Sequence, residues 1–158
     1  VDFAVTIPAF ADTSLRRMLL YTERYVCIAR KAHPLKKGRL TLDEFCRFPH
    51  VIVSPTGGSF SGPTDEALGE RGIRREVCLS VPSFHLMLEA VRSDDLLALI
   101  PERFLRGKSA GLKLFEPPVP VPDFDVIACW HQRQDHDPAQ HWLRDQLIAA
   151  AKRTAGDA

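Results

Sequence analysis

Strand-like and helix-like segments alternate along the middle of the chain, and this order constrains the fold more than any other feature. Apolar and polar residues alternate over 77–81, which predicts a strand. The next apolar side chains recur at the spacing of one helix face: Phe84, Met87, Leu88 and Val91. A fully apolar run over 96–100 then predicts a buried strand. This order predicts an α/β fold with a mainly parallel sheet.

The flanking segments extend the pattern. Further strands are predicted at 1–6, 25–30, 50–54, 112–115 and 124–130. Thr41 and Glu44 carry the signature of a capping box, so a short helix should begin there. Pro63 and Pro138 stand at favourable first helical positions, the second directly after the capping residue Asp137.

Composition and charge exclude two classes of function. Lys and Arg total 21 against 20 Asp and Glu, so a net charge of +1 offers no field to hold a nucleic acid. The run over 96–100 is far too short to span a bilayer. Four cysteines lie far apart beside apolar neighbours: Cys27, Cys46, Cys78 and Cys129. Buried, reduced thiols and a cytoplasmic location are therefore expected.

The first residues read as a strand, with no initiator Met and no signal peptide. We therefore expect the chain to begin inside a domain.

Ligands of α/β sheets bind in loops that follow the carboxyl ends of strands. Three loops fit that description, at 6–8, 56–62 and 81–84. The predicted ligand-binding residues are Thr6, Ile7, Thr56, Ser59, Phe60, Ser61, Gly62, Pro82, Ser83 and Phe84.

The loop over 55–62 matches neither of two catalytic or phosphate-binding motifs. It lacks the G-x-S-x-G of a nucleophile elbow and the Gly-Lys-Ser/Thr ending of a phosphate loop. Two interpretations stay open: an anion cradle of hydroxyls and backbone N–H groups, or a plain connecting loop. We predict no catalytic residue, and hence no enzyme.

The histidines are given structural interpretations. His131, His136 and His141 are five residues apart, which places helical side chains on different faces. We therefore predict neither a metal site nor a cofactor. His50, at a predicted strand start, carries no functional signal.

The basic residues are dispersed and balanced by acids, which favours a solvated surface; they include Arg16, Arg17, Arg71, Arg74 and Arg75. Trp130 and Trp142 are predicted to be core residues.

Several short motifs follow one another in a distinctive order: Tyr25–Arg30, His33–Leu35, Leu40–Phe45, Asp94–Pro101, Trp130–His131, Asp137–Pro138 and Trp142–Arg144. Their order and spacing resemble the effector domain of LysR-type transcriptional regulators over almost the whole chain. The last three motifs are most similar to the branch of the nodulation and naphthalene/salicylate-degradation regulators.

The resemblance implies the fold of type 2 periplasmic binding proteins, with two α/β lobes joined by crossover strands. The first lobe would comprise 1–16 and 129–158, and the second 17–128. It also implies a helix-turn-helix domain and a strand–helix–strand unit before Val1, which this chain lacks. The first lobe is therefore expected to be incomplete, and its uncovered edge to favour a homo-oligomer.

The resemblance also implies a function, the sensing of a small effector in the cleft between the lobes of a bacterial regulator. For this branch a small aromatic acid or phenolic compound is expected, which the rings of Phe60 and Phe84 and the nearby hydroxyls would suit. DNA would be bound only through the helix-turn-helix domain, and no membrane is involved. The alternative is an exported solute-binding protein of the same fold; a hydrolase or transferase comes third.

Overall fold

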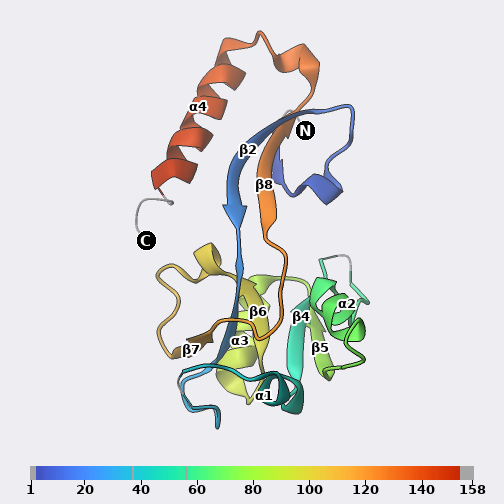
Figure 1. Ribbon diagram of the computed structural model, residues 1–158. Coiled ribbons are helices and arrows are strands. Elements are labelled where there is room, and N and C mark those ends of the chain that lie inside the picture. Colours follow the sequence, from blue (N-terminus) through green and yellow to red (C-terminus); the bar gives the residue numbers. More distant parts are fainter. Residues whose placement is uncertain (1–2, 37, 56, 154–158) are drawn as a thin grey trace. The chain divides into compact units, whose positions relative to one another are not determined.

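The computed structural model describes residues 3–36, 38–55 and 57–153, which belong to two compact units (Figure 1). Unit 1 comprises Val1–Glu23 and Asp123–Ala158, and unit 2 is the continuous segment Arg24–Pro122. The predicted lobes, 1–16 with 129–158 and 17–128, have different boundaries. The difference arises because Arg16–Glu23 and Phe124–Trp130 pair along their length and so belong to one unit.

Unit 2 is built on a mixed sheet. Its strands are β3 (Tyr25–Arg30), β4 (His50–Val53), β5 (Val77–Val81), β6 (Ala98–Pro101) and β7 (Leu112–Phe115). Its helices are α1 (Leu42–Arg47), α2 (Pro63–Gly69), α3 (Phe84–Ser93) and the 3-10 helix η2 (Glu102–Leu105). β3 lies between β6 and β7 and is antiparallel to both, whereas β4 and β5 are parallel. A parallel bridge between His50 and Leu97 joins the two parts.

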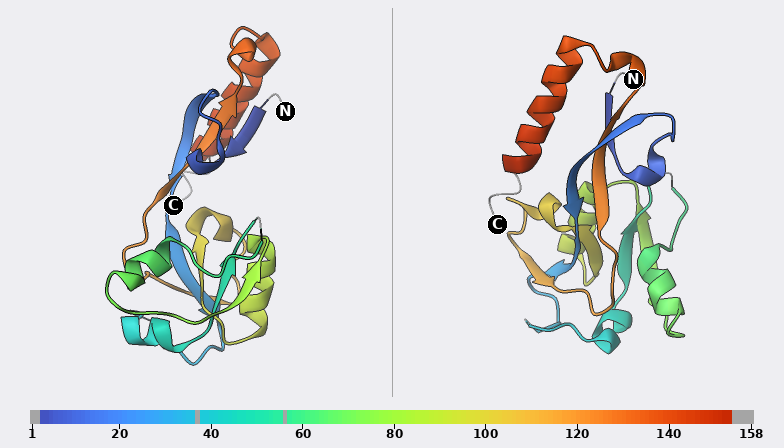
Figure 2. Two further views of the ribbon diagram at one scale, coloured as in Figure 1. Left: turned by 90° about the vertical axis from the view of Figure 1, so that its right-hand side faces the viewer. Right: turned by 45° about the horizontal axis from the view of Figure 1, so that its top comes forward.

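Strand β3 is apolar over residues 26–29 because a hydrophobic cluster covers each face of the sheet. On one face, Val26 and Ile28 share a cluster with the apolar stripe of α3. On the other, Cys27 packs with Phe45 of α1 and Leu68 of α2. Figure 2 shows α3 on the opposite side of the sheet from α1 and α2. Each fully buried large apolar side chain contributes about 1.5–3 kcal/mol.

Unit 1 is a three-stranded antiparallel sheet with one long helix. The strands β1 (Phe3–Thr6), β8 (Phe124–Trp130) and β2 (Arg16–Glu23) lie in the order β1-β8-β2. Helix α4 (Pro138–Arg153) contacts β2, and the 3-10 helices are η1 (Pro8–Phe10) and η3 (Gln132–Gln134).

Trp130 connects strand β8 to the start of α4. Its indole N–H donates to Asp135 at 2.8 Å, and the Arg144 guanidinium lies 4.7 Å from its ring centre. The ring of Phe3 stacks on it at 6.0 Å. Trp130 is half-buried, but Trp142 is 64% exposed, so the prediction that both are core residues is wrong. Trp142 therefore lies on an exposed face of α4 within the described chain.

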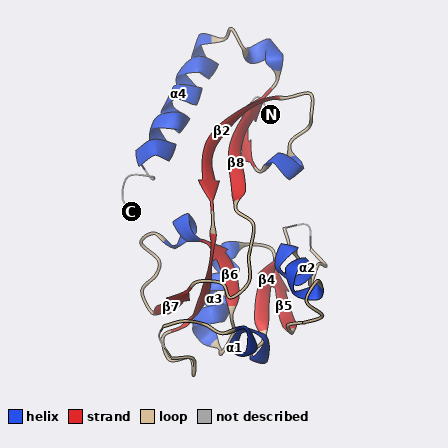
Figure 3. Ribbon diagram, in the orientation of Figure 1, coloured by secondary structure: helices blue, strands red, loops and turns tan. Residues whose placement is uncertain are grey.

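The helix starts predicted from capping residues are confirmed (Figure 3). Thr41 and Glu44 make both halves of a capping box, and Ser83 accepts from the Leu86 N–H at 3.4 Å. Asp137 accepts from the Ala139 N–H at 2.8 Å. Among the residues described, no helix is both long and apolar enough to cross a membrane.

The sheets differ from the sequence analysis in two respects: one strand was missed and one expectation is wrong. Strand β2 was not predicted, because a register shift between Leu19 and Tyr21 breaks its alternation. The sheets are also not mainly parallel, since among the described residues only β4–β5 and the His50–Leu97 bridge pair that way. The strand–helix–strand order predicts parallel neighbours where a helical crossover joins adjacent strands, but no such crossover joins β3 or β8 to a strand beside it in the described structure.

Candidate functional site

The loops after β4 and β5 leave the same edge of the sheet. The two strands are parallel, with Val51 opposite Leu79 and Val53 opposite Val81. A hydrogen bond from the Ser80 hydroxyl to the Ser59 carbonyl oxygen, 2.8 Å long, ties the first loop to the second strand. The structure therefore brings the predicted segments 59–62 and 82–84 to one edge of unit 2.

Glycines shape the first loop. Gly57 and Gly58 have φ of 80° and 79°, a left-handed conformation that costs other residues free energy. The turn is closed by a hydrogen bond from the Gly57 N–H to the Ser54 carbonyl oxygen at 3.0 Å. Thr56, also predicted as a ligand contact, lies outside the described residues.

Serine hydroxyls at this edge form hydrogen bonds with the protein backbone. Ser59 Oγ donates to the Ser61 carbonyl oxygen at 2.8 Å and accepts from the Ser61 N–H at 3.3 Å. Ser83 Oγ caps α3, and Phe84 packs into the core beside Phe104, 5.6 Å away between ring centres. Phe60, by contrast, is 54% exposed.

No residue of 59–62 or 82–84 carries a formal charge. A ligand seated here would meet hydroxyls, backbone N–H groups and phenyl edges. Thr6 ends β1 and Ile7 precedes η1, both in unit 1, and their part in a ligand site stays a prediction.

A buried ion pair lies beneath the first loop. Arg75 donates from Nε and Nη2 to the Asp65 carboxylate at 2.8 and 2.9 Å, and its side chain is only 4% exposed. Its Nη1 donates to Nδ1 of His50 at 3.2 Å, and His50 is completely buried. The predicted solvated surface is therefore wrong for Arg75, and His50 is a core residue. The sequence signal was the acid Asp65 at the third position of α2, which pairs with a base ten residues later.

Burial, hydrogen bonds and the charges of this cluster shift two pKa values. Burial lowers the pKa of His50 to about 4, and the Arg75 charge acts in the same direction. Burial alone would raise the pKa of Asp65, but hydrogen bonds from Arg75 and from the Gly62 N–H hold it below its ordinary value. The cluster therefore consists of a neutral imidazole and a fully ionised pair near neutral pH.

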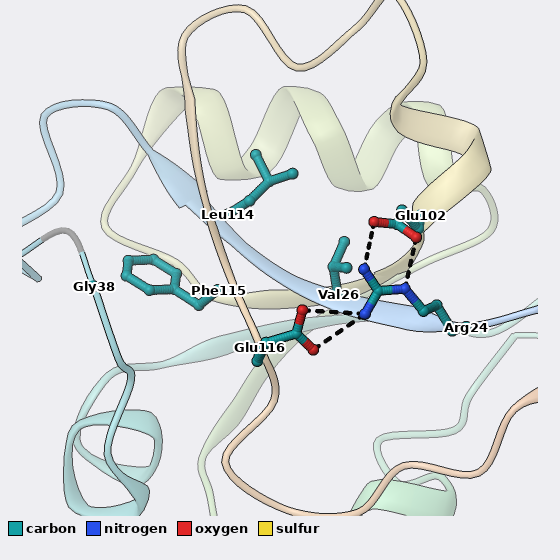
Figure 4. A pocket seen from close by; sticks show the side chains of 7 residues that line it. All are labelled: Arg24, Val26, Gly38, Glu102, Leu114, Phe115 and Glu116. Atoms are coloured by element: carbon teal, nitrogen blue, oxygen red, sulfur yellow. Dashed lines mark hydrogen bonds and ion pairs between the residues drawn. The ribbon is translucent and has the colours of Figure 1, made fainter. Parts of the chain in front are cut away.

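Arg24 lines a separate pocket of about 260 Å³ on the β3–β7 side of unit 2 (Figure 4). Arg24 donates to Glu102 at 2.6 Å and to Glu116 at 3.1 Å, which lowers the pKa of Glu102. The guanidinium is already hydrogen-bonded to two carboxylates, so the pocket is poorly suited to an acidic ligand. Of the predicted ligand-binding residues that the structure describes, none lines it.

The described part of the chain holds no group of three or more His, Cys, Asp or Glu side chains arranged to bind a metal ion. Of the spaced histidines, His131 accepts from the Arg133 N–H at 3.2 Å and so begins η3.

Known proteins resemble this chain closely. It is 34% identical over 150 residues to the HTH-type transcriptional activator NahR of Pseudomonas putida, covering 94% of this chain and 50% of NahR. It is 30% identical to nodulation protein D 3 of Rhizobium leguminosarum bv. phaseoli, covering 97% of this chain and 51% of that protein. The chain thus spans about half the length of the curated relatives it matches, and the resemblance to the nodulation regulators is confirmed.

A solved structure agrees. The regulatory domain of MexT, a transcriptional activator in Pseudomonas aeruginosa, superposes with a TM-score of 0.77 at 28% identity, covering 94% of this chain and 72% of that domain's chain. The family model described as the LysR substrate binding domain matches residues 1–152. The fold and this match over residues 1–152 agree, and the chain belongs to the LysR substrate-binding domain family.

Proposed function

We propose that this chain is the ligand-sensing domain of a bacterial LysR-type regulator, acting in the cytoplasm within a homo-oligomer and catalysing no reaction. The family match over residues 1–152 carries the proposal. Matched relatives such as NahR are transcriptional activators, so the alternative of an exported solute-binding protein is not favoured. DNA contact would be made by a helix-turn-helix domain outside these residues.

The effector class follows from the chemistry of the loop edge together with the family branch. An exposed phenyl ring at Phe60, the hydroxyl of Ser61 and backbone N–H groups suit a small aromatic acid or phenol. The effector-binding domain of QuiR, with the same fold at a TM-score of 0.74 and 18% identity, was solved in complex with shikimate. In our proposal the effector sits between the lobes, touching Thr6 and Ile7 as well as the loops of unit 2.

Sensing requires that the effector favour one arrangement of the lobes over another. Its differential affinity for the two arrangements sets how far the population moves. The readout is then a change in the DNA-binding part of the regulator rather than a chemical step.

Thermal unfolding in the presence of benzoate, 2-hydroxybenzoate and phenol tests the proposal, with cyclohexanecarboxylate as the non-aromatic acid. Ligand at a hundredfold excess over its dissociation constant stabilises by about 2.7 kcal/mol. We expect an aromatic probe to raise the unfolding temperature in a saturable way. This rise in unfolding temperature should be smaller in Phe60→Ala and Ser61→Ala. The control Ser109→Ala changes an exposed serine on the η2–β7 connection and should leave the rise intact. An equal increase in unfolding temperature in all three variants would contradict the assigned site. So would an equal increase with the aromatic and the non-aromatic acids.

A further inference from the structure

The loop over 59–62 is linked to the buried core through one arginine. The Gly62 N–H donates to Asp65 Oδ2 at 2.8 Å, and the Asp65 N–H donates back to the Gly62 carbonyl oxygen at 2.8 Å. The same carboxylate receives two hydrogen bonds from Arg75. The end of the loop and the first turn of α2 are thus held by one carboxylate, whose orientation Arg75 sets.

Behind Arg75, two further contacts lead into the core. Its guanidinium meets Nδ1 of His50 at 3.2 Å and lies 5.8 Å from the ring centre of Phe45. The opposite ring nitrogen of His50 contacts the Phe45 carbonyl oxygen at 2.7 Å. Since Nδ1 accepts from Arg75, the proton of the neutral ring lies on Nε2 and is donated to Phe45. A continuous series of contacts thus connects Gly62, through Asp65, Arg75 and His50, with Phe45 in a buried apolar cluster.

The other side-chain hydrogen bonds of the loop are either longer or exposed to water, including the 2.8 Å bond from the Ser80 hydroxyl to the Ser59 carbonyl oxygen. The Ser59 N–H reaches Ser54 Oγ only at 3.3 Å, and the Ser59–Ser61 pair is exposed to water. A buried ion pair contributes little to net stability, since desolvation offsets most of its attraction, but it does specify geometry. A contribution to overall stability is therefore a poor explanation for the Arg75–Asp65 ion pair.

We infer that Arg75 is a positioning residue for the effector loop: through Asp65 it holds 59–62 in the conformation that meets the ligand. The inference rests on the proposed function in one respect, that this loop contacts an effector. The positioning itself is a property of the ligand-free chain and can be measured without one.

Hydrogen exchange of the backbone amides tests the positioning in the 158-residue chain, comparing Arg75→Met with Arg74→Met, its exposed neighbour. In Arg75→Met the Gly62 amide should exchange about tenfold faster or more, while amides of β3 and β6 change by less than about twofold. Arg75→Lys, which keeps the charge but not the paired geometry, should fall between. Arg74→Met should match the wild type. If Arg75→Met fails to fold, Asp65→Asn, which keeps an oxygen for the Gly62 N–H, should show the same contrast between loop and core.

Equal acceleration of loop and core amides, or an unchanged loop, would overturn the inference. Titration with 2-hydroxybenzoate forms the second arm, where Arg75→Met should weaken binding several-fold and Arg74→Met should not. If the wild type binds none of the aromatic probes, the proposed effector class fails, while the exchange contrast still decides the role of Arg75. If the probe binds and Arg75→Met leaves its affinity unchanged, the loop is held for some purpose other than ligand contact and the inference fails.

Discussion

His50 makes unit 2 sensitive to mild acid. Its ring is completely buried between Phe45, whose carbonyl oxygen accepts from it, and Arg75. Asp65 of α2, paired with Arg75, is the carboxylate that faces this group. Burial lowers the pKa of His50 from an ordinary 6.5 to about 4.

The sign of the effect follows from proton counting. In the unfolded chain the imidazole takes up a proton below about pH 6.5, whereas in the folded chain it stays neutral down to about pH 4. The unfolded state therefore binds more protons in this window, and the free energy of unfolding falls as the pH drops from 6.5 to 4. The difference between the two pKa values corresponds to roughly 3 kcal/mol over the whole window.

Urea unfolding at several pH values, comparing wild type with His50→Gln, measures this contribution. Glutamine is polar but does not titrate. The unfolding free energy of His50→Gln should therefore fall less steeply with decreasing pH, and the difference in slope should correspond to at most one proton per molecule. His141→Gln removes an exposed histidine of α4 and should follow the wild type. Both tryptophans lie in unit 1, so their fluorescence follows that unit while circular dichroism follows both. Identical pH slopes for wild type and His50→Gln would refute the reasoning.

Three further predictions follow from other features. Gly57→Ala and Gly58→Ala should each lower the free energy of unfolding by about 1 kcal/mol, because each φ is left-handed, whereas Gly62→Ala, with its extended φ of −161°, should cost less in a denaturant titration. The exposed side chains of Val5 and Trp142 in unit 1 predict concentration-dependent self-association in sedimentation; a wild type that stays monomeric, or a Trp142→Ser variant that associates as strongly as wild type, would contradict this. With a net charge of +1, the isolated chain should show no sequence preference in a DNA titration at physiological salt, and specific submicromolar binding would contradict that expectation.

Local patterns predicted the local structure well. The helix starts at Thr41, Ser83 and Asp137 depend on contacts within a few residues, so their capping residues indicated them correctly. The shared edge of the loops after β4 and β5 followed from the strand–helix–strand order. These features are encoded within short windows of sequence.

Pairings between distant residues were not predictable in the same way. Arg75 looks like any other surface arginine until the fold brings Asp65 and His50 against it. Strand β2 is stabilised by pairing with β8, which lies more than a hundred residues later in the sequence, and its own residues show no clear strand alternation. Whether a tryptophan is covered depends on which face of α4 it occupies, and Trp142 occupies the open one.

The order β1-β8-β2 has a consequence for synthesis on the ribosome. The two N-terminal strands do not pair with each other, and their common partner β8 is made only after the whole of unit 2. Unit 2 is continuous and can complete its sheet as soon as it emerges, while β1 and β2 must wait with open edges. Strands β1 and β2 therefore lack their partner until Phe124–Trp130 has been synthesised, and a pause before that point would leave a folded unit 2 beside two strands not yet paired with β8.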